Sequence, residues 1–526
     1  MIRIVKNNIR AYELAKEQKE ISISEFFTKN RHLLGFDNPV RALLTTIKEL
    51  VDNSLDACDE MKVLPDIMVQ ISSVSENRYR VVVEDNGPGI VKQQIPNIFA
   101  KLLYGSKFFK LRQSRGQQGI GVSASVLYGQ LTTGKSAKII SKIDPKKPAH
   151  YYGLHIDTAR NEPEILKEEV VKWDKDHGTK VEIELEGNYK FGARYIESYL
   201  KQTAMVNPHL KLIYIDPEKK KKTFSRAVSE LPTEPKAIKP HPHGIELGIL
   251  MNMLKNTKAR TIQSFLTNDF CRVGSKTAKN ICDMAKINTN ARPKRIARQE
   301  ADNLLQAIKK TKLIAPPTDC LSPIGSSLLE KGLKKEVNAE FFTAITRPPS
   351  VYRGMPFQIE AAIAYGGDLD KEGNVKVMRF ANKVPLLYQQ GACAITKSIQ
   401  QTKWRSYGLQ QSGNNIPVGP AMIVVHIASV WVPFTSESKE AIAHYPEIIK
   451  EVKLALQECG RQLSRYIRRK IRSKEQKERV NLFEKYIPEI AISLSNISGI
   501  SRIKIENDLN KILKKNTNQI IKEGEI

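Results

Sequence analysis

The sequence predicts an α/β protein of several domains, with an all-helical insert and a helical C-terminal stalk. Three observations support this fold class. Helical and strand patterns alternate in two separate regions, two proline-rich breaks flank a strand-free basic region between them, and the C-terminal region is helical and highly charged. The 526 residues are enough for about three domains of roughly 150 residues.

The four predicted regions follow one another along the chain. Residues 1–228 contain strand patterns such as "YRVVVEDN" and "TKVEIELEG" between helical ones, which is typical of an α/β sandwich. The break "LPTEPKAIKPHPHG" leads into a basic all-helical domain over 229–315. After "IAPPTDCLSPIG", a second α/β domain over 316–470 runs into a stalk helix, and 471–526 form a C-terminal helical region.

Composition limits the partner and the compartment. The 84 lysines and arginines outnumber the 56 acids, and the net charge of +28 favours a polyanionic partner such as nucleic acid. The six cysteines never form C-x-x-C pairs, so neither a zinc site nor a disulfide framework is indicated. The most apolar run, "AMIVVHIASVWVPF", is too short to span a bilayer. We expect a soluble, cytoplasmic protein with no membrane partner.

The helical stretch "KELVDNSLDA", residues 48–57, concentrates carboxylates on one face. At about 100° per residue, Glu49, Asp52, Asn53, Asp56 and Glu60 share one stripe. On this stretch alone, the solvated face of an amphipathic helix is the simpler interpretation.

Two glycine motifs follow and change that interpretation. Strand "RYRVVVEDN" ends in "DNGPGI", which places Asp85 at the strand end with Gly87 and Gly89 behind it, where a flat ligand can approach the backbone. Next, "SRGQQGIGVSASVLYG" places glycines 116, 119 and 121 before a helical pattern, where free N–H groups suit phosphates. Each motif alone is weak, but the ordered combination is rare.

This ordered set resembles the GHKL (Bergerat-fold) ATPases, which include the ATPase domains of type II topoisomerases. The resemblance implies that Glu49 is the general base that orients water, that Asn53 binds Mg²⁺ and that Asp85 accepts a hydrogen bond from adenine. "HGTKVEI" matches a later element of that family and gives Thr179 an adenine contact, although an ordinary strand threonine is a close alternative. The resemblance implies ATP and Mg²⁺ as cofactors, and its remaining ATP-binding residues are Gly87, Gly89, Ser106, Lys107, Gly116, Gln117, Gln118, Gly119, Ile120, Gly121, Val122 and Ser123.

A competing motif is "GQLTTGKS", Gly129–Ser136, which fits the P-loop pattern. A P-loop needs a strand before it and a helix after it. Here "VSASVLYG" before the motif predicts a helix and "SAKIISKID" after it predicts a strand, so we disfavour this alternative.

The domain order resembles that of the B subunit in the archaeal-type DNA topoisomerase VI family, a type IIB enzyme. The insert resembles a helix-two-turns-helix domain, with Gly274 and Lys276 at a helix start. In that family the second α/β domain is a transducer that presents a cation to the γ-phosphate. The usual W-K-x-Y motif is "KWRSY" here, so either Arg405 by position or Lys403 before the tryptophan takes that role.

The resemblance also implies partners and a mechanism. ATP would join two copies of the chain, with an exchange of the N-terminal arm, and their closure would trap a DNA duplex so that strand passage relaxes supercoils and decatenates DNA. A separate A subunit would cut the DNA within an A2B2 heterotetramer at the nucleoid, and the C-terminal region of this chain would contact it. A nucleic-acid-binding scaffold that senses nucleotide without turnover is the alternative from another class.

Overall fold

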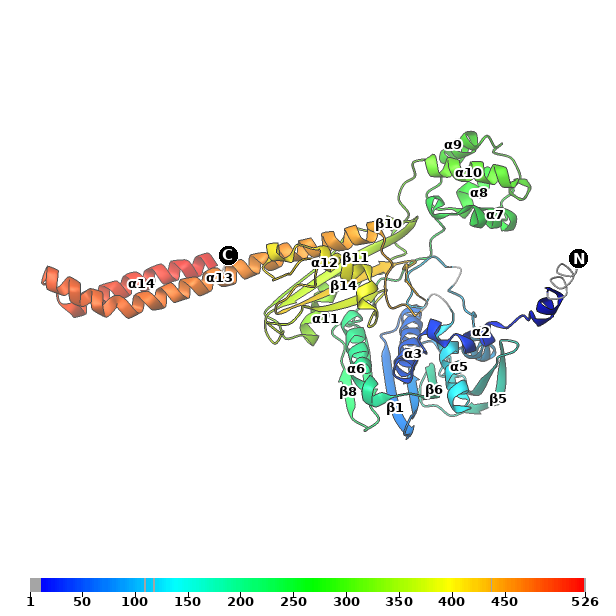
Figure 1. Ribbon diagram of the computed structural model, residues 1–526, viewed down its shortest axis with the longest axis horizontal. Coiled ribbons are helices and arrows are strands. Elements are labelled where there is room, and N and C mark those ends of the chain that lie inside the picture. The colour runs from blue at the N-terminus through cyan, green and yellow to red at the C-terminus, as the bar shows by residue number, and fades with distance from the viewer. Residues whose placement is uncertain (1–10, 108–109, 117–118, 437, 525–526) are drawn as a thin grey trace, which may run out of the picture.

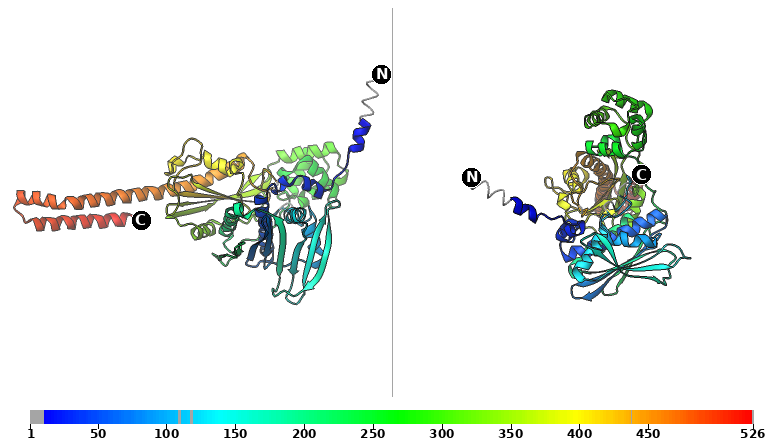
Figure 2. Two further views of the ribbon diagram at one scale, coloured as in Figure 1. Left: turned by 60° about the horizontal axis from the view of Figure 1, so that its bottom comes forward. Right: turned by 90° about the vertical axis from the view of Figure 1, so that its right-hand side faces the viewer.

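The computed structural model describes residues 11–524 except 108–109, 117–118 and 437, and describes 514–524 as backbone only. Two α/β bodies lie side by side, a small helical body stands apart from them, and a long helical hairpin projects away (Figure 1). The N-terminal segment leads outward from the first body (Figure 2). This arrangement confirms the predicted multidomain α/β fold class.

The first body is built on an eight-stranded sheet in the order β5-β4-β3-β6-β2-β1-β7-β8. All neighbouring pairs are antiparallel except β1 and β7. Buried and more exposed residues alternate along β1 and β6, so that one face of the sheet is covered. The strands are β1 Asp66–Ser75, β2 Arg78–Glu84, β3 Ala137–Lys142, β4 Ala149–Asp157, β5 Glu162–Val171, β6 Gly178–Glu186, β7 Lys211–Ile215 and β8 Lys221–Phe224.

Helices form the layer over this sheet and share its hydrophobic core. They are α3 (Pro39–Met61), α4 (Ile95–Ala100), α5 (Gly121–Thr133) and α6 (Tyr189–Val206). Helix α3 begins where the Asn38 side chain accepts a hydrogen bond from the Arg41 N–H at 2.9 Å, with Pro39 in the first turn. It ends at Lys62, which adopts the left-handed conformation. A short helix, α2 (Ile23–Lys29), precedes it, and the Ser24 hydroxyl donates to Asn161 Oδ1 at 2.8 Å.

The stretch Gly129–Ser136 does not have the surroundings of a P-loop. It lies at the end of α5, which terminates at Gly134 with φ of +68°, and β3 follows it. The helix therefore comes before the motif and the strand after it, as the sequence predicts.

The insert forms a small helical body with its own core. Its helices are α7 (Leu247–Asn256), α8 (Ile262–Asp269), α9 (Ser275–Ala285) and α10 (Arg298–Lys310). Phe265 and Phe270 meet edge to face in this core, with ring centroids 5.4 Å apart. Helix α9 begins after Gly274, as predicted, and leaves Lys276 exposed.

The second α/β body contains a sheet in the order β10-β11-β14-β12-β13, with β9 also paired to β11. Helices α12 (Ala394–Gln401) and α13 (Pro446–Ser498) share one hydrophobic core with this sheet, and α11 (Ser326–Glu336) shares another with it. All nine residues of β14 are buried, which explains the apolar run seen in the sequence. The strands are β9 Phe341–Thr346, β10 Ser350–Tyr352, β11 Met355–Tyr365, β12 Lys376–Ala381, β13 Val384–Pro385 and β14 Ala421–Ser429.

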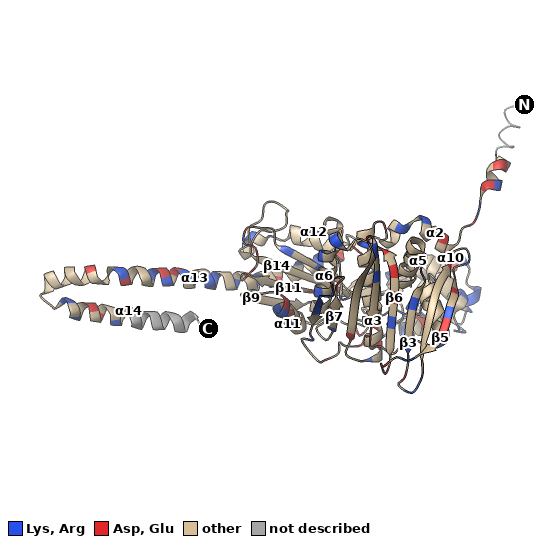
Figure 3. Cartoon of the chain, turned by 90° about the horizontal axis from the view of Figure 1, so that it is seen from below, with Lys and Arg blue, Asp and Glu red and all other residues tan. Residues whose placement is uncertain are grey.

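The projecting hairpin consists of α13 and α14 (Arg502–Gly524), which pack against each other. Helix α13 has 53 residues and is therefore about 80 Å long at about 1.5 Å per residue. It continues through residue 470, where the sequence interpretation divides the last two regions. Positively and negatively charged residues are interspersed along it (Figure 3). Over the described residues, no helix combines the length and apolar character needed to cross a membrane.

Candidate nucleotide-binding site

A cavity of about 620 Å³ opens between α3, the end of β2, the start of β6, and the glycine-rich segment before α5. It gathers most of the site residues that the sequence predicts. Gly87 does not line it, but its N–H donates a hydrogen bond to Asp85. Gln117 and Gln118 lie outside the described residues. The predicted residues that line it are Glu49, Asn53, Asp85, Gly89, Ser106, Lys107, Gly116, Gly119, Ile120, Gly121, Val122, Ser123 and Thr179.

Glu49 and Asn53 occupy successive turns of α3 on the cavity side. Asn53 Nδ2 donates to the Glu49 carbonyl oxygen at 2.8 Å, which leaves the amide oxygen as an acceptor. That amide oxygen lies near the glycine-rich segment, since a Cβ added at Gly116 would meet it at 3.6 Å. A Cβ added at Gly121 would lie 1.8 Å from Glu49 Oε2, so the Glu49 carboxylate abuts the first residue of α5.

The carboxylate stripe of α3 is solvated only in part, because Asn53 and Glu60 are exposed while other members are buried. Asp52 and Asp56 are each only 6% exposed. Asp52 accepts a hydrogen bond from the Tyr199 hydroxyl at 2.9 Å, and burial raises the pKa of Asp52 to about 6. Burial would also raise the pKa of Asp56, but Lys107 and Arg115 outweigh this effect and hold it below its ordinary value. The stripe thus combines cavity-lining groups with buried anchors.

Asp85 lies at the opposite wall of the cavity, at the end of β2. Its Oδ1 accepts from the Gly87 N–H at 2.9 Å and from the Thr179 N–H at 3.2 Å, and its Oδ2 accepts from the Ser54 hydroxyl at 2.8 Å. Burial raises the pKa of Asp85, and these hydrogen bonds oppose the rise. A carboxylate with two oxygens has about four acceptor positions, so Asp85 keeps capacity for one more donor.

The glycines at this wall are required by close approach. Gly89 has φ of +67°, and a Cβ there would lie 2.0 Å from the Lys142 carbonyl oxygen. Gly178, beside Thr179, has φ of +134°, and its Cβ would lie 2.2 Å from the Asp85 carbonyl oxygen. The Thr179 hydroxyl lies 3.0 Å from the Ser141 hydroxyl. Thr179 also lines the cavity. Its contact with adenine stays a prediction.

The glycine-rich segment forms the third wall. The first turn of a helix leaves backbone N–H groups without intrahelical partners, and Gly119 to Ser123 bring the start of α5 to the cavity. At the N-terminal end of the segment, Lys107 Nζ lies 2.5 Å from Asp56 Oδ2. Further along it, the Gly116 N–H donates to the same oxygen at 3.3 Å. Asp56 therefore contacts both ends of this segment, which we call the glycine loop (residues 107–121, of which 108–109 and 117–118 lie outside the described residues).

Among the described residues of the second α/β body, Lys439 is the cation that lines the cavity, and the sequence interpretation missed it. Neither Arg405 nor Lys403 lines the cavity; both are exposed, and Arg405 Nε donates to the Gln411 carbonyl oxygen at 2.6 Å. Lys439 lies in the connection between β14 and α13. The neighbouring Glu440 forms an ion pair with Arg41 of α3. This packing between distant segments, rather than any local motif, brings Lys439 to the site.

The site combines the groups needed to bind and hydrolyse a nucleoside triphosphate. Asp85 is a buried hydrogen-bond acceptor at one wall. The start of α5 offers N–H groups to phosphates, and the Glu49 carboxylate lies against its first residue, where it can act on water. Within the described residues, no group of three His, Cys, Asp or Glu side chains is placed to hold a metal ion. Mg²⁺ takes few protein ligands and keeps phosphate oxygens and waters, so the Asn53 amide oxygen fits that ion.

Comparisons with known proteins agree with this geometry. Residues 38–187 match the family described as histidine kinase-, DNA gyrase B-, and HSP90-like ATPase, and residues 316–479 match the topoisomerase VI B subunit transducer family. The chain is 53% identical over 487 residues to the type 2 DNA topoisomerase 6 B subunit of Methanococcoides burtonii, covering 92% of this chain and 78% of that protein. The same subunits of Methanosarcina barkeri and Archaeoglobus fulgidus are 50% and 47% identical, covering 93% and 95% of this chain and 79% and 83% of theirs.

Proposed function

This chain belongs to the family of type 2 DNA topoisomerase 6 B subunits, and from that premise we propose that it is the ATP-driven gate of a two-subunit DNA topoisomerase. It is an ATP-hydrolysing topoisomerase subunit with a GHKL ATPase domain and a transducer domain. The observation that carries the proposal is the single cavity that joins Glu49, Asn53, Asp85 and the start of α5.

In this proposal Asp85 selects adenine and Glu49 acts on water. Asp85 accepts a hydrogen bond from the adenine amino group, and the Thr179 hydroxyl supports the same ring. Glu49 accepts a hydrogen bond from the attacking water and orients it, a task for a carboxylate within hydrogen-bond reach. Bound ATP with Mg²⁺ supplies the phosphoryl group and the metal charge that phosphoryl transfer needs.

The remaining groups neutralise charge on the triphosphate. Asn53 gives its amide oxygen to Mg²⁺. Lys107 and the N–H groups at the start of α5 hold the phosphates. We assign the γ-phosphate contact to Lys439 instead of Arg405 or Lys403, because Lys439 lines the cavity and the other two side chains do not. Hydrolysis is thereby tied to the position of the transducer.

We further propose that ATP joins two copies of the chain. The segment before α2 carries apolar side chains at the surface, with Tyr12 74% and Leu14 54% exposed. Such side chains favour a protein partner over water, and a second copy of the chain is the partner proposed here. The transducers then carry the closure along α13, so that two chains enclose a DNA duplex.

The basic helical insert and the stalk serve different partners. Exposed Lys276 and Lys279 lie at the start of α9, which suits DNA phosphates. The far end of the stalk carries exposed apolar side chains: Leu482, Phe483, Tyr486, Ile497, Ile500 and Ile503. We propose that this end docks onto a topoisomerase VI-type A subunit in an A2B2 heterotetramer. DNA cleavage belongs to that subunit, and ATP-driven strand passage relaxes supercoils and decatenates DNA.

Steady-state ATP hydrolysis tests the proposal, measured with Mg²⁺, DNA and a cognate A subunit. Glu49→Gln should lower kcat by about 10²-fold or more while nucleotide binding is retained. Lys135→Ala, in the P-loop-like stretch, is the matched control and should keep near-normal activity. The reverse pattern would make Gly129–Ser136 the nucleotide site. Failure of the unaltered pair of subunits to relax supercoiled DNA with ATP would instead support a nucleotide-sensing scaffold.

A further inference from the structure

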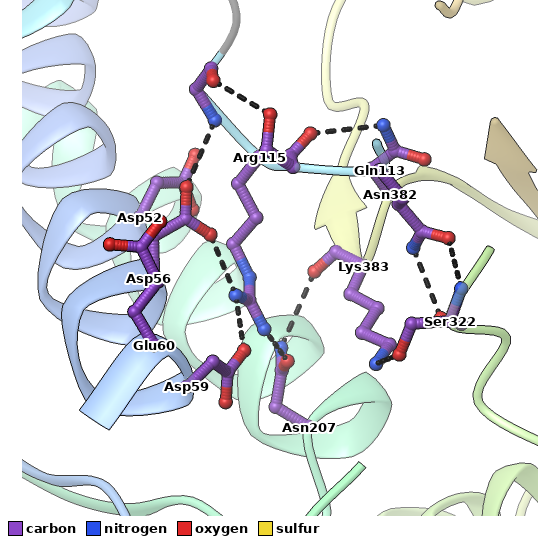
Figure 4. A network of polar contacts seen from close by, with 12 residues as sticks. Asp52, Asp56, Asp59, Glu60, Gln113, Arg115, Asn207, Ser322, Asn382 and Lys383 are labelled. Carbon is purple, nitrogen blue, oxygen red and sulfur yellow. Dashed lines mark hydrogen bonds and ion pairs between the residues drawn. The ribbon is translucent and has the colours of Figure 1, made fainter. Parts of the chain in front are cut away.

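Three consecutive residues directly before Gly116 of the glycine loop each form hydrogen bonds or ion pairs with a different part of the molecule. They are Gln113, Ser114 and Arg115, and Figure 4 shows the polar network around them. Gln113 and Arg115 are only 6% and 7% exposed. Because these residues lead directly into Gly116, whatever holds them also holds one stem of the glycine loop.

Gln113 is tied to the segment that precedes the transducer sheet. Its side-chain Nε2 donates to the Ser322 carbonyl oxygen at 3.0 Å, and the Ser322 N–H donates to Gln113 Oε1 at 2.7 Å. The Gln113 N–H donates to the Cys320 carbonyl oxygen at 3.0 Å. This pairing fixes the register between the two segments.

Ser114 is tied to the turn between β12 and β13 of the transducer. Its carbonyl oxygen accepts from Asn382 Nδ2 at 3.0 Å. Asn382 also exchanges two hydrogen bonds of 2.9 Å with the backbone of Ser429 at the end of β14. Asn382 and Lys383 have φ of +49° and +66°, the left-handed values that a two-residue hairpin turn requires. The turn thus reaches out of its sheet to the glycine loop.

Arg115 makes the third connection. Its Nη1 lies 2.9 Å from Asp56 Oδ1 and 2.7 Å from Asp59 Oδ2, both on α3. Its Nη2 donates to Asn207 Oδ1 at 2.6 Å. Asn207 follows α6 and donates from Nδ2 to the Lys383 carbonyl oxygen at 3.3 Å. Asn207 therefore bridges Arg115 and the transducer turn, and it is fully buried.

These contacts leave the turn and the loop stem little freedom to move separately. The side chains of Gln113, Arg115, Asn207 and Asn382 are buried. Breaking one of their hydrogen bonds therefore leaves a buried polar group without a partner, which costs free energy. Asp56 holds the other stem of the glycine loop through Lys107. A displacement of the loop is therefore passed to Arg115, and through Asn207 and Ser114 to the turn.

We propose that Asn382, Asn207 and Arg115 are positioning residues that make the glycine loop and the β12–β13 turn move together, as a link between nucleotide and transducer that is separate from Lys439. The inference rests on the proposed ATP-driven function. Nucleotide that binds at Gly116 and the start of α5 would set the position of the transducer through this link, and by reciprocity the transducer would set nucleotide affinity.

The test measures transducer movement in the full chain. Spin labels are placed at Phe191→Cys on α6 and Ile471→Cys on α13, both exposed positions, with Cys271→Ser to remove the partly exposed native thiol. Label distances are recorded with and without a non-hydrolysable ATP analogue and Mg²⁺, alongside the dissociation constant of the analogue.

Two variants cut the link at different elements. Asn382→Gly keeps a residue suited to positive φ while removing the side chain, and Asn207→Ala removes the bridge after α6. The matched control is Gln411→Ala. The Gln411 side chain makes three hydrogen bonds, to Trp404, Gln400 and Asn415, all within the transducer.

The unaltered chain and Gln411→Ala should show the full nucleotide-induced change in distance. Asn382→Gly and Asn207→Ala should still bind the analogue, with a dissociation constant changed by about fivefold or more because the coupling is reciprocal, and should lose about half of the change in distance or more. If either folded link variant showed the full nucleotide-induced change in label distance, the inference would be overturned and the proposed function would stand. Absence of analogue binding by the unaltered chain would overturn the proposed function, and the inference with it.

Discussion

The Glu49 carboxylate and Gly121 are in direct contact, so that a single carbon added to Gly121 would lie 1.8 Å from Glu49 Oε2. The contact joins α3 to the first residue of α5, where helix N–H groups meet the cavity. It places the proposed general base beside the proposed phosphate site. Glycine at position 121 is therefore required for the Glu49 carboxylate to lie where it does.

Gly121→Ala should displace the Glu49 carboxylate and lower kcat for ATP hydrolysis. A displacement of about 1 Å in a catalytic group costs about 10²-fold. Steady-state kinetics with a thermal unfolding profile would separate this effect from misfolding. Gly248→Ala is the control, since it lies early in α7 and a Cβ there meets no atom within 4 Å. Equal activity in the two variants would contradict the proposed role of the contact.

Lys439→Ala should lower kcat by about 10² to 10³-fold, the effect of removing one group that stabilises charge in a transition state. Nucleotide binding should weaken much less, because the side chain is proposed to contact only the terminal phosphate. Arg405→Ala and Lys403→Ala serve as paired controls and should retain hydrolysis. Loss of hydrolysis in Arg405→Ala, with Lys439→Ala unaffected, would return the cation to the W-K-x-Y position.

The contrast between Glu49 and Lys439 shows what the sequence can predict. Glu49, Asp85 and the glycines lie in short motifs whose spacing follows from the 3.6-residue helical period and from backbone geometry. Lys439 has no local signal of this kind. It reaches the cavity because Glu440 pairs with Arg41 and the transducer packs on the first body, and such tertiary packing cannot be derived from a spacing.

The α3 carboxylates show a second limit. Helical periodicity correctly places Asp52 and Asp56 on the same stripe as Glu49, but it cannot distinguish a wet residue from a buried one. Their burial depends on Tyr199 and Arg115, which approach from distant parts of the chain. The fold class, in contrast, can be predicted from the sequence, because the alternating patterns and proline-rich breaks that indicate it extend over long stretches.

Asp52→Asn should make the stability of the first body less dependent on pH. Burial raises the pKa of Asp52 to about 6 from 3.8, so the folded state holds this proton more tightly than the unfolded state does. Between about pH 4 and pH 6 this group therefore costs stability as pH rises, by about 3 kcal/mol in total. Asparagine keeps the acceptor for Tyr199 without the charge.

The Tm of Asp52→Asn relative to the unaltered chain should accordingly be higher at pH 7.5 than at pH 4.5. A difference on the order of 5 °C follows for a domain of this size. A difference that does not change with pH would show that Asp52 is ionised at no cost in the folded protein.

Phe483→Ala should weaken binding to the A subunit without changing nucleotide binding. Phe483 is 55% exposed on the stalk, among other exposed apolar side chains near the α13–α14 turn. Removal of an aromatic side chain from a protein interface commonly costs about 1 to 2 kcal/mol, so the dissociation constant measured by titration calorimetry should rise about tenfold. Phe191→Ala on α6 is the matched control, because Phe191 is 73% exposed but lies on the first body. If both substitutions left the affinity unchanged, the A subunit would have to dock elsewhere; if only Phe191→Ala weakened it, the docking surface would lie on the first body instead of the stalk.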